Sequence, residues 1–131
     1  MDAKQLDALT ESIIGAAIDV HRELGPGLLE NSYEACLCFA LLALGLRVER
    51  QKALPVRYKS EVLDYGYRID LLVEEAVIVE VKAIERFERV HVAQLISYLK
   101  FANLQVGLLL NFNVALLSRN GIKRVVNGFP E

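Results

Sequence analysis

The sequence lacks the features that would place the chain in a membrane or outside the cell. No apolar run reaches the roughly 20 residues that a membrane-spanning helix needs. The first residues, Met-Asp-Ala-Lys-Gln, contain neither the basic stretch nor the apolar segment of a secretion signal. Cysteine is scarce, and Cys36 and Cys38 lie two residues apart in a predicted helix, where they can neither pair nor jointly bind zinc. We therefore expect a cytoplasmic protein with reduced thiols and no membrane contact.

An excess of positive charge is also missing. The chain has 15 lysines and arginines against 17 aspartates and glutamates, a formal net charge of −2. Proteins that grip DNA by neutralising phosphates are usually basic, so tight non-specific binding by one copy is not expected. A nuclease is not excluded, because a bound metal brings its own positive charge. Local basic residues either contact nucleic acid or form a solvated face: Arg47, Arg50, Lys52, Arg57, Lys59, Arg86 and Arg89.

The 131 residues predict one domain, residues 1–131, that buries about two-thirds of its unfolded surface. Apolar residues make up 53% of the chain and charged residues 24%, as is usual for a compact globular protein. Apolar periodicity and turn residues predict helices at 6–24, 28–44 and 88–102. They predict strands at 47–51, 54–59, 62–73, 77–83, 105–111 and 122–126, with turns at 59–61 and 74–76 and a bulge at Gly66.

Three charged residues interrupt two of these apolar strands. Asp70 lies in Tyr-Arg-Ile-Asp-Leu-Leu-Val (67–73), and Glu80 and Lys82 lie in Val-Ile-Val-Glu-Val-Lys-Ala (77–83). Residues 69, 71, 73, 77, 79 and 81 predict one buried face, while Leu72 and Ile78 indicate burial on the other face as well. If Val73 faces Val77, Asp70 faces Glu80 with Cβ atoms about 4.5–5.5 Å apart, and Lys82 shares the face of Glu80.

Buried charges of this kind need a partner, because their desolvation costs several kcal/mol, to order of magnitude. Two close carboxylates are relieved by a shared proton or by a hard cation such as Mg²⁺, which takes one or two protein carboxylates and completes its shell with water and phosphate. Lys82 could then orient or deprotonate an attacking water, or steady the charged phosphate. The alternative is a buried Asp/Glu–Lys ion pair that only fixes the register of the strands.

Asp70…Glu80-Val81-Lys82 resembles the PD-(D/E)XK nuclease signature, with Ile69 where that pattern has proline. Gly27-Leu-Leu-Glu30-Asn-Ser-Tyr33 resembles the motif that names the GxxExxY family of the same superfamily, and the similarity runs over about residues 14–127. The resemblance implies a mixed α/β fold with an α-β-β-β-α-β core, here preceded by an extra N-terminal helix. It also implies a Mg²⁺- or Mn²⁺-dependent nuclease.

The resemblance assigns roles to individual residues. Asp70, Glu80 and the Val81 carbonyl would bind the metal, with Glu30 as a further ligand, directly or through water. Glu30 would otherwise be an exposed charge favoured by the helix dipole. Gln94-x-x-x-Tyr98 resembles a motif of an exonuclease-like branch, in which the glutamine and tyrosine lie near the metal and the substrate phosphate. Tyr33 is expected to be a core aromatic residue.

Two main functions remain open at this point, and a third, a non-nuclease metal-dependent phosphohydrolase, has no sequence feature of its own. The first is a nuclease whose partner is nucleic acid, DNA rather than RNA. The second is a catalytically weak or inactive module that binds nucleic acid or protein on the same fold. An intact Asp/Glu/Lys set favours the enzyme, because a pure binding module has no reason to keep it. We also predict a homodimer, formed through apolar residues of the N-terminal helix or through free sheet edges.

Overall fold

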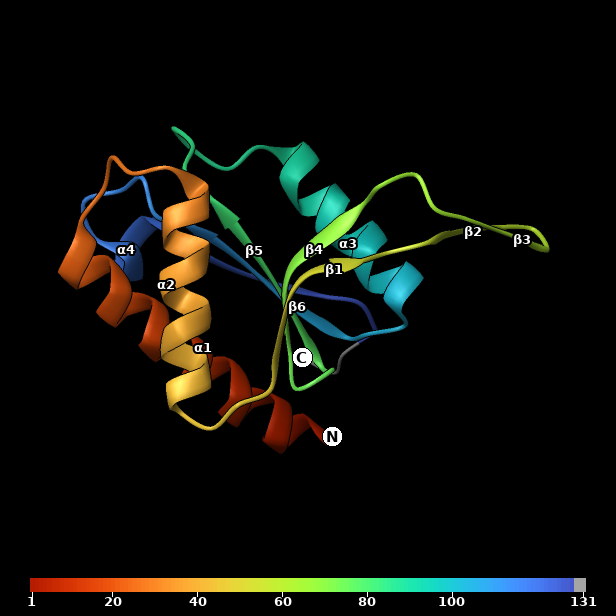
Figure 1. Cartoon of the computed structure of the whole chain (residues 1–131), viewed down its shortest axis with the longest axis horizontal. Coiled ribbons are helices and arrows are strands. Elements are labelled where there is room, and N and C mark those ends of the chain that lie inside the picture. The colour runs from red at the N-terminus through yellow and green to blue at the C-terminus, as the bar shows by residue number, and fades with distance from the viewer. Residues whose placement is uncertain (129–131) are drawn as a thin grey trace.

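The computed structural model describes residues 1–128, which form a mixed five-stranded sheet between two helical layers (Figure 1). The sheet order is β1-β4-β5-β6-β7, and only the β5–β6 pair is parallel. The helices are α1 (Ala3–Leu24), α2 (Glu30–Ala43), α3 (Arg89–Ala102) and α4 (Leu117–Asn120). The strands are β1 (Val48–Ala53), β2 (Val56–Tyr58), β3 (Glu61–Leu63), β4 (Arg68–Val73), β5 (Val77–Lys82), β6 (Val106–Asn111) and β7 (Ile122–Val126).

The order of the elements confirms the predicted fold class. The chain runs from α2 through the antiparallel strands β1, β4 and β5, crosses over through α3 and returns in β6 alongside β5. This is the α-β-β-β-α-β order, and α1 is the extra N-terminal helix. The predicted strand at 122–126 has the bounds of β7, whereas α4 was not predicted, because four residues are too few to show a helical period.

Helices cover both faces of the sheet, so the central strands are apolar throughout. One core cluster contains Leu71, Val79 and Leu108 together with residues of α1 and α2, and a second contains Leu72, Ile78 and Leu109 together with residues of α3. The predicted burial on both sides is therefore confirmed. Ile69 was expected to share the face of residues 71 and 73, but it belongs to the α3 cluster. The change of side falls at Asp70, where β4 leaves its regular pairing with β5.

The predicted strand at 62–73 is in fact two strands in two sheets. Residues 61–63 pair with β2 in a separate hairpin that projects beside α3, and residues 68–73 form β4 (Figure 1). Gly66 between them has φ +84°, a left-handed conformation that glycine adopts easily. The predicted bulge at Gly66 is thus a break at which the chain leaves the hairpin and enters the main sheet.

The β4–β5 turn sets the register on which the charged residues depend. Glu74 and Glu75 both have positive φ, 54° and 52°, as a tight antiparallel turn requires. Val73 pairs with Val77, which confirms the predicted register. The turn is also tied to the chain before β1, because the backbone N–H of Arg47 donates to the Glu74 carboxylate at 2.6 Å and the N–H of Glu74 donates to the Arg47 carbonyl at 2.8 Å.

Tyr33 holds the turn before α2 and is the fully buried aromatic residue that the sequence predicts. Its hydroxyl donates to the Gly25 carbonyl at 2.5 Å and accepts from the Leu28 N–H at 3.1 Å. Its ring stacks on Phe112, with centroids 4.6 Å apart. Gly27 within this turn has φ +102°, which strains any other residue. The glycine and the tyrosine of the motif therefore fix the chain that leads to Glu30, the first residue of α2.

We expect Tyr33→Phe to lower the free energy of unfolding by about 1–3 kcal/mol, because the Leu28 N–H and the Gly25 carbonyl lose their shared partner while the stacked ring remains. The matched control is Tyr58→Phe, which alters an exposed tyrosine whose hydroxyl forms no hydrogen bond within residues 1–128. Urea unfolding followed by circular dichroism measures both variants. Equal stability of the two would show that the hydroxyl of Tyr33 does not hold the turn.

Candidate active site around Asp70 and Glu80

Asp70 and Glu80 face each other at the point where the β4–β5 pairing ends. The last regular pair is Leu71–Val79. One position further, the Asp70 N–H donates to Glu80 Oε2 and the Val81 N–H donates to Asp70 Oδ2, each at 2.9 Å. Each carboxylate thus accepts a backbone hydrogen bond from the opposite strand, in the place of a carbonyl. The strands remain joined, and the two acidic groups are fixed side by side.

Burial makes the negative charge of this pair costly. Only 4% of Glu80 is exposed, and burial, followed by the charge of Asp70, raises the pKa of Glu80 to about 8. The pKa of Asp70 is also raised, first by burial, and the Val81 N–H opposes that shift. Without a cation, the pair therefore retains a proton at neutral pH. A divalent cation could replace that proton, because carboxylates bind a metal in their deprotonated form. The pair therefore has the chemistry that a metal site requires.

The site also offers free oxygen atoms. Among the described residues, Glu80 Oε1 accepts no hydrogen bond, and no side-chain oxygen that is fully buried lacks a partner, so Oε1 borders accessible space. The N–H and C=O of one strand residue point to the same side of the strand. The Val81 carbonyl therefore lies on the side of Asp70, whereas the Lys82 carbonyl on the other side accepts from the Phe112 N–H at 2.9 Å.

Lys82 does not form the ion pair that the alternative interpretation requires. Within residues 1–128 its ammonium group has neither a salt bridge within 4.0 Å nor a hydrogen bond. Its charge nevertheless lies close enough to lower the pKa of both Asp70 and Glu80. Lys82 is thus a partly buried cation next to the acidic pair, and its N–H donors have no acceptor within residues 1–128.

Two residues that sequence reasoning missed surround the pair. Glu34 on α2 is buried and raises the pKa of both acids through its charge. Its carboxylate accepts from Arg50 Nε at 2.5 Å and from Gln51 Nε2 at 2.8 Å. The same Gln51 nitrogen donates to Asp70 Oδ1 at 3.2 Å, and Gln51 has φ +55° within β1. Such a conformation costs on the order of 1–3 kcal/mol and is typical of functional sites.

A signal for Glu34 exists in the sequence, because it lies on the buried stripe of α2 with Leu37 and Leu41. No such signal exists for Gln51. Arg50, expected to contact nucleic acid or solvent, is instead the ion-pair partner of Glu34.

The remaining predicted site residues lie around this centre. Glu30 is exposed, and its carboxylate accepts from the Ala83 N–H at 3.1 Å, directly after Lys82. Its charge is not among those that shift the pKa of Asp70 or Glu80. Tyr98 is 7% exposed, and its pKa is raised by burial and then by the charge of Glu80. Gln94 lines a surface groove together with Tyr98 and forms no hydrogen bond with either acid.

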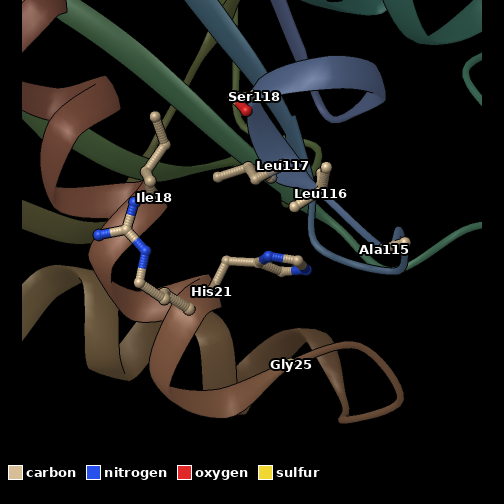
Figure 2. A pocket seen from close by; sticks show the side chains of 8 residues that line it. Ile18, His21, Gly25, Ala115, Leu116, Leu117 and Ser118 are labelled. Carbon is tan, nitrogen blue, oxygen red and sulfur yellow. The ribbon is translucent and has the colours of Figure 1, made fainter.

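A separate cavity of about 270 Å³ lies between the end of α1 and the loop that leads into α4 (Figure 2). The buried ring of His21 borders it, with Nε2 at 3.1 Å from the Phe112 carbonyl and at 2.8 Å from the Val114 carbonyl. Because carbonyl oxygens only accept, Nε2 carries the hydrogen. His21 therefore anchors the chain after β6, and no residue of the acidic pair lines this cavity.

Two features are absent from the described part of the chain. Among residues 1–128, no three His, Cys, Asp or Glu side chains come together as a metal-binding group, so a cation at this site would have two carboxylates and backbone or water oxygens. Within the same residues, no helix combines the length and the apolar character needed to cross a bilayer.

Comparison with known proteins identifies the family. A family model described as the PD-(D/E)XK nuclease superfamily matches residues 7–125. No curated protein and no solved structure matches the chain.

The raised pKa of Glu80 predicts how stability depends on pH. The folded protein holds a proton that the unfolded chain releases from pH 4.5 upward, so without metal the free energy of unfolding falls between about pH 4.5 and about pH 8. One proton corresponds to at most about 1.4 kcal/mol per pH unit. Glu80→Gln cannot ionise and should flatten this slope, whereas the exposed Glu85→Gln should keep it. Urea unfolding in EDTA across this pH range measures the slope for both variants. An unchanged slope in Glu80→Gln would show that Glu80 does not hold the proton.

Proposed function

The chain belongs to the PD-(D/E)XK nuclease superfamily, and we propose that it is a Mg²⁺- or Mn²⁺-dependent nuclease that hydrolyses phosphodiester bonds in nucleic acid. The observation that carries the proposal is the Asp70–Glu80 pair, two carboxylates fixed side by side by backbone N–H groups of opposite strands, with Lys82 beside them and in no ion pair within residues 1–128. A purely structural pair has no need of this arrangement, because a neighbouring lysine would neutralise it.

The metal would be held by Asp70, Glu80 and the Val81 carbonyl. Mg²⁺ typically takes one or two protein carboxylates and leaves its other positions to water and phosphate oxygens, so two carboxylates suffice. Glu30 stays a predicted further ligand, and its bond to the Ala83 N–H favours the route through a water molecule over direct contact. A bound divalent cation would supply positive charge for the phosphate and lower the pKa of the attacking water.

The side chains around the pair would handle the proton and the substrate. Lys82 has three N–H donors and no partner among the described residues, so it can orient the attacking water, accept its proton when deprotonated, or stabilise the negative charge that develops on the phosphate. Tyr98 and Gln94 would contact the substrate from α3, where the charges of Glu80 and Asp70 act on Tyr98. The reaction needs only water as co-substrate.

The finer parts of the proposal concern partners and assembly. DNA rather than RNA as substrate and a cytoplasmic location stay predictions. So does the homodimer. The apolar face of α1 is buried in the core and is not available for it, whereas the sheet edges stay a predicted surface. One group of exposed apolar side chains lies on and after α2: Phe39, Leu42 and Leu44. The alternative, a module that binds without turnover, is tested by the two variants below.

We expect the wild-type protein to bind Mn²⁺ near pH 8, and Asp70→Ala to abolish this binding, since the cation loses one of two carboxylates. Isothermal titration calorimetry measures both. The control Glu85→Ala removes an exposed carboxylate that forms no ion pair within residues 1–128 and should bind Mn²⁺ like the wild type. Circular dichroism verifies that each variant is folded. Unchanged affinity in a folded Asp70→Ala variant would rule out a metal at this pair.

Lys82→Ala should leave Mn²⁺ binding intact and lower the cleavage rate by about 10²-fold or more, as expected for losing a group that acts on the water or the phosphate. The matched control is Lys100→Ala, an exposed lysine on α3 without an ion pair among the described residues. Cleavage of labelled single-stranded and duplex oligonucleotides measures the rates. If Lys82 were only structural, the variant would instead lose stability at an unchanged rate per folded molecule, and the mechanism would lose its lysine.

A further inference from the structure

A groove of about 460 Å³ lies between α3 and the chain that links β3 to β4. Its walls carry an unusual share of aromatic rings for a protein in which only 8% of residues are aromatic. The rings are those of Tyr65, Tyr67, Tyr98 and Phe101, and the polar side chains of Gln94 and Ser97 lie among them. Figure 1 shows that the hairpin β2–β3 extends beyond this part of α3.

Three of these rings are left open to solvent. Tyr65 is 70% exposed, Tyr67 45% and Phe101 43%. Within residues 1–128, the hydroxyls of Tyr65 and Tyr67 form no hydrogen bond, and neither Tyr65 nor Phe101 has a ring partner. Tyr67 is held edge-to-face against the buried Tyr98, with centroids 6.0 Å apart. Aromatic side chains gain most when they are covered, so a row of open rings along a groove indicates a ligand with planar, apolar faces.

The groove leads to the acidic pair. Tyr67 precedes Asp70 by three residues along one segment of chain, about 10 Å at the rise of a strand. Tyr98 lines the groove, and after burial the nearby charges of Glu80 and Asp70 are among the causes that raise its pKa. A chain molecule that lies in the groove would therefore reach Asp70 and Glu80 with the next part of its backbone.

Charge along this edge is suited to phosphates, in contrast to the protein as a whole. Residues 52–68 contain four basic side chains, Lys52, Arg57, Lys59 and Arg68, and two acidic ones, Glu61 and Asp64. The segment carries +2, whereas the whole chain carries −2. Within residues 1–128, Arg57 and Lys59 have no acidic partner, and both are exposed on the projecting hairpin.

We propose that this groove binds unpaired nucleobases, and that the protein acts on single-stranded nucleic acid whose backbone follows the basic hairpin to the acidic pair. The substrate class rests on the proposed nuclease function, but binding of the strand can be measured without it. Every base offers a flat face to the rings, so stacking requires no particular sequence. In a duplex these faces are covered by neighbouring bases, and the net negative protein has little other means of holding a double helix.

The test is binding in EDTA, which keeps metal-dependent cleavage out of the measurement. Fluorescence anisotropy is recorded with labelled oligo-dT of about 16 nucleotides, the upper site size of a small single-strand binding domain. It is compared with oligo-U, with the matched duplex, and with an abasic strand of the same phosphate number. We expect both unpaired oligomers to bind more tightly than the duplex, and the abasic strand to lose most of the affinity.

Variants of the exposed rings identify the groove. Tyr65→Ala and Phe101→Ala should each weaken binding of oligo-dT by about 5-fold to about 150-fold, as for the loss of one stacked base, with the salt dependence unchanged. Tyr65→Phe should bind like the wild type, because the ring is kept. The matched control is Tyr58→Ala, which removes a similarly exposed tyrosine of the nearby hairpin β2–β3 that does not line the groove. All three positions are exposed, and circular dichroism verifies that the four variants are folded.

The inference is overturned by equal binding of abasic and oligo-dT strands, by preference for the duplex, or by equal effects of Tyr65→Ala and Tyr58→Ala. If the rings instead contact a second copy, Tyr65→Ala will dissociate a dimer in sedimentation without altering strand preference, which also overturns it. Single-strand binding without cleavage in Mn²⁺ would reject the proposed nuclease and leave this inference standing. Cleavage in Mn²⁺ with no preference for single strands would reject this inference and leave the proposed nuclease standing.

Discussion

The cost of placing two carboxylates inside a sheet that is covered on both faces governs this structure. Apolar side chains surround the middle of β4 and β5, so the negative charges of Asp70 and Glu80 are poorly solvated. The protein does not neutralise them with an adjacent ion pair. It binds each carboxylate to the backbone N–H of the opposite strand, keeps a proton on the pair, and leaves Lys82 nearby with its donors free. A site of this kind is poised to exchange its proton for a cation.

The surrounding structure holds this costly arrangement in place. Glu34, Arg50 and Gln51 form a polar network that links α2 and β1 to Asp70. Just after the end of β5, Ile84 is held by Asn111 of β6, which is 1% exposed: the Asn111 side chain accepts from the Ile84 N–H at 3.0 Å and donates to the Ile84 carbonyl at 2.9 Å. These contacts fix the chain on both sides of the pair. The packed core therefore holds Asp70 and Glu80 in place, away from other side chains that could pair with their charges.

The sequence predicts the placement of Asp70 and Glu80 better than the structure around them, for physical reasons. Charged residues in β-branched runs stand out, and the short turn at 74–76 permits only one register, so Asp70 and Glu80 could be placed opposite each other from the sequence. Glu34 could have been found from the helical stripe that it shares with Leu37. Gln51 could not, because its role depends on a left-handed backbone within β1 that its residue type does not indicate. The break at Gly66 was mistaken for a bulge, since an isolated glycine is compatible with both.

The measurement that tests the central claim most directly is the anomalous diffraction of a crystal grown with Mn²⁺ near pH 8. The account predicts one strong anomalous peak at the Asp70–Glu80 pair, with carboxylate oxygens and the Val81 carbonyl about 2.0–2.6 Å away, the range of hard cations with oxygen ligands. Density for the cation elsewhere, or none at the pair while both carboxylates keep their backbone hydrogen bonds, would contradict it.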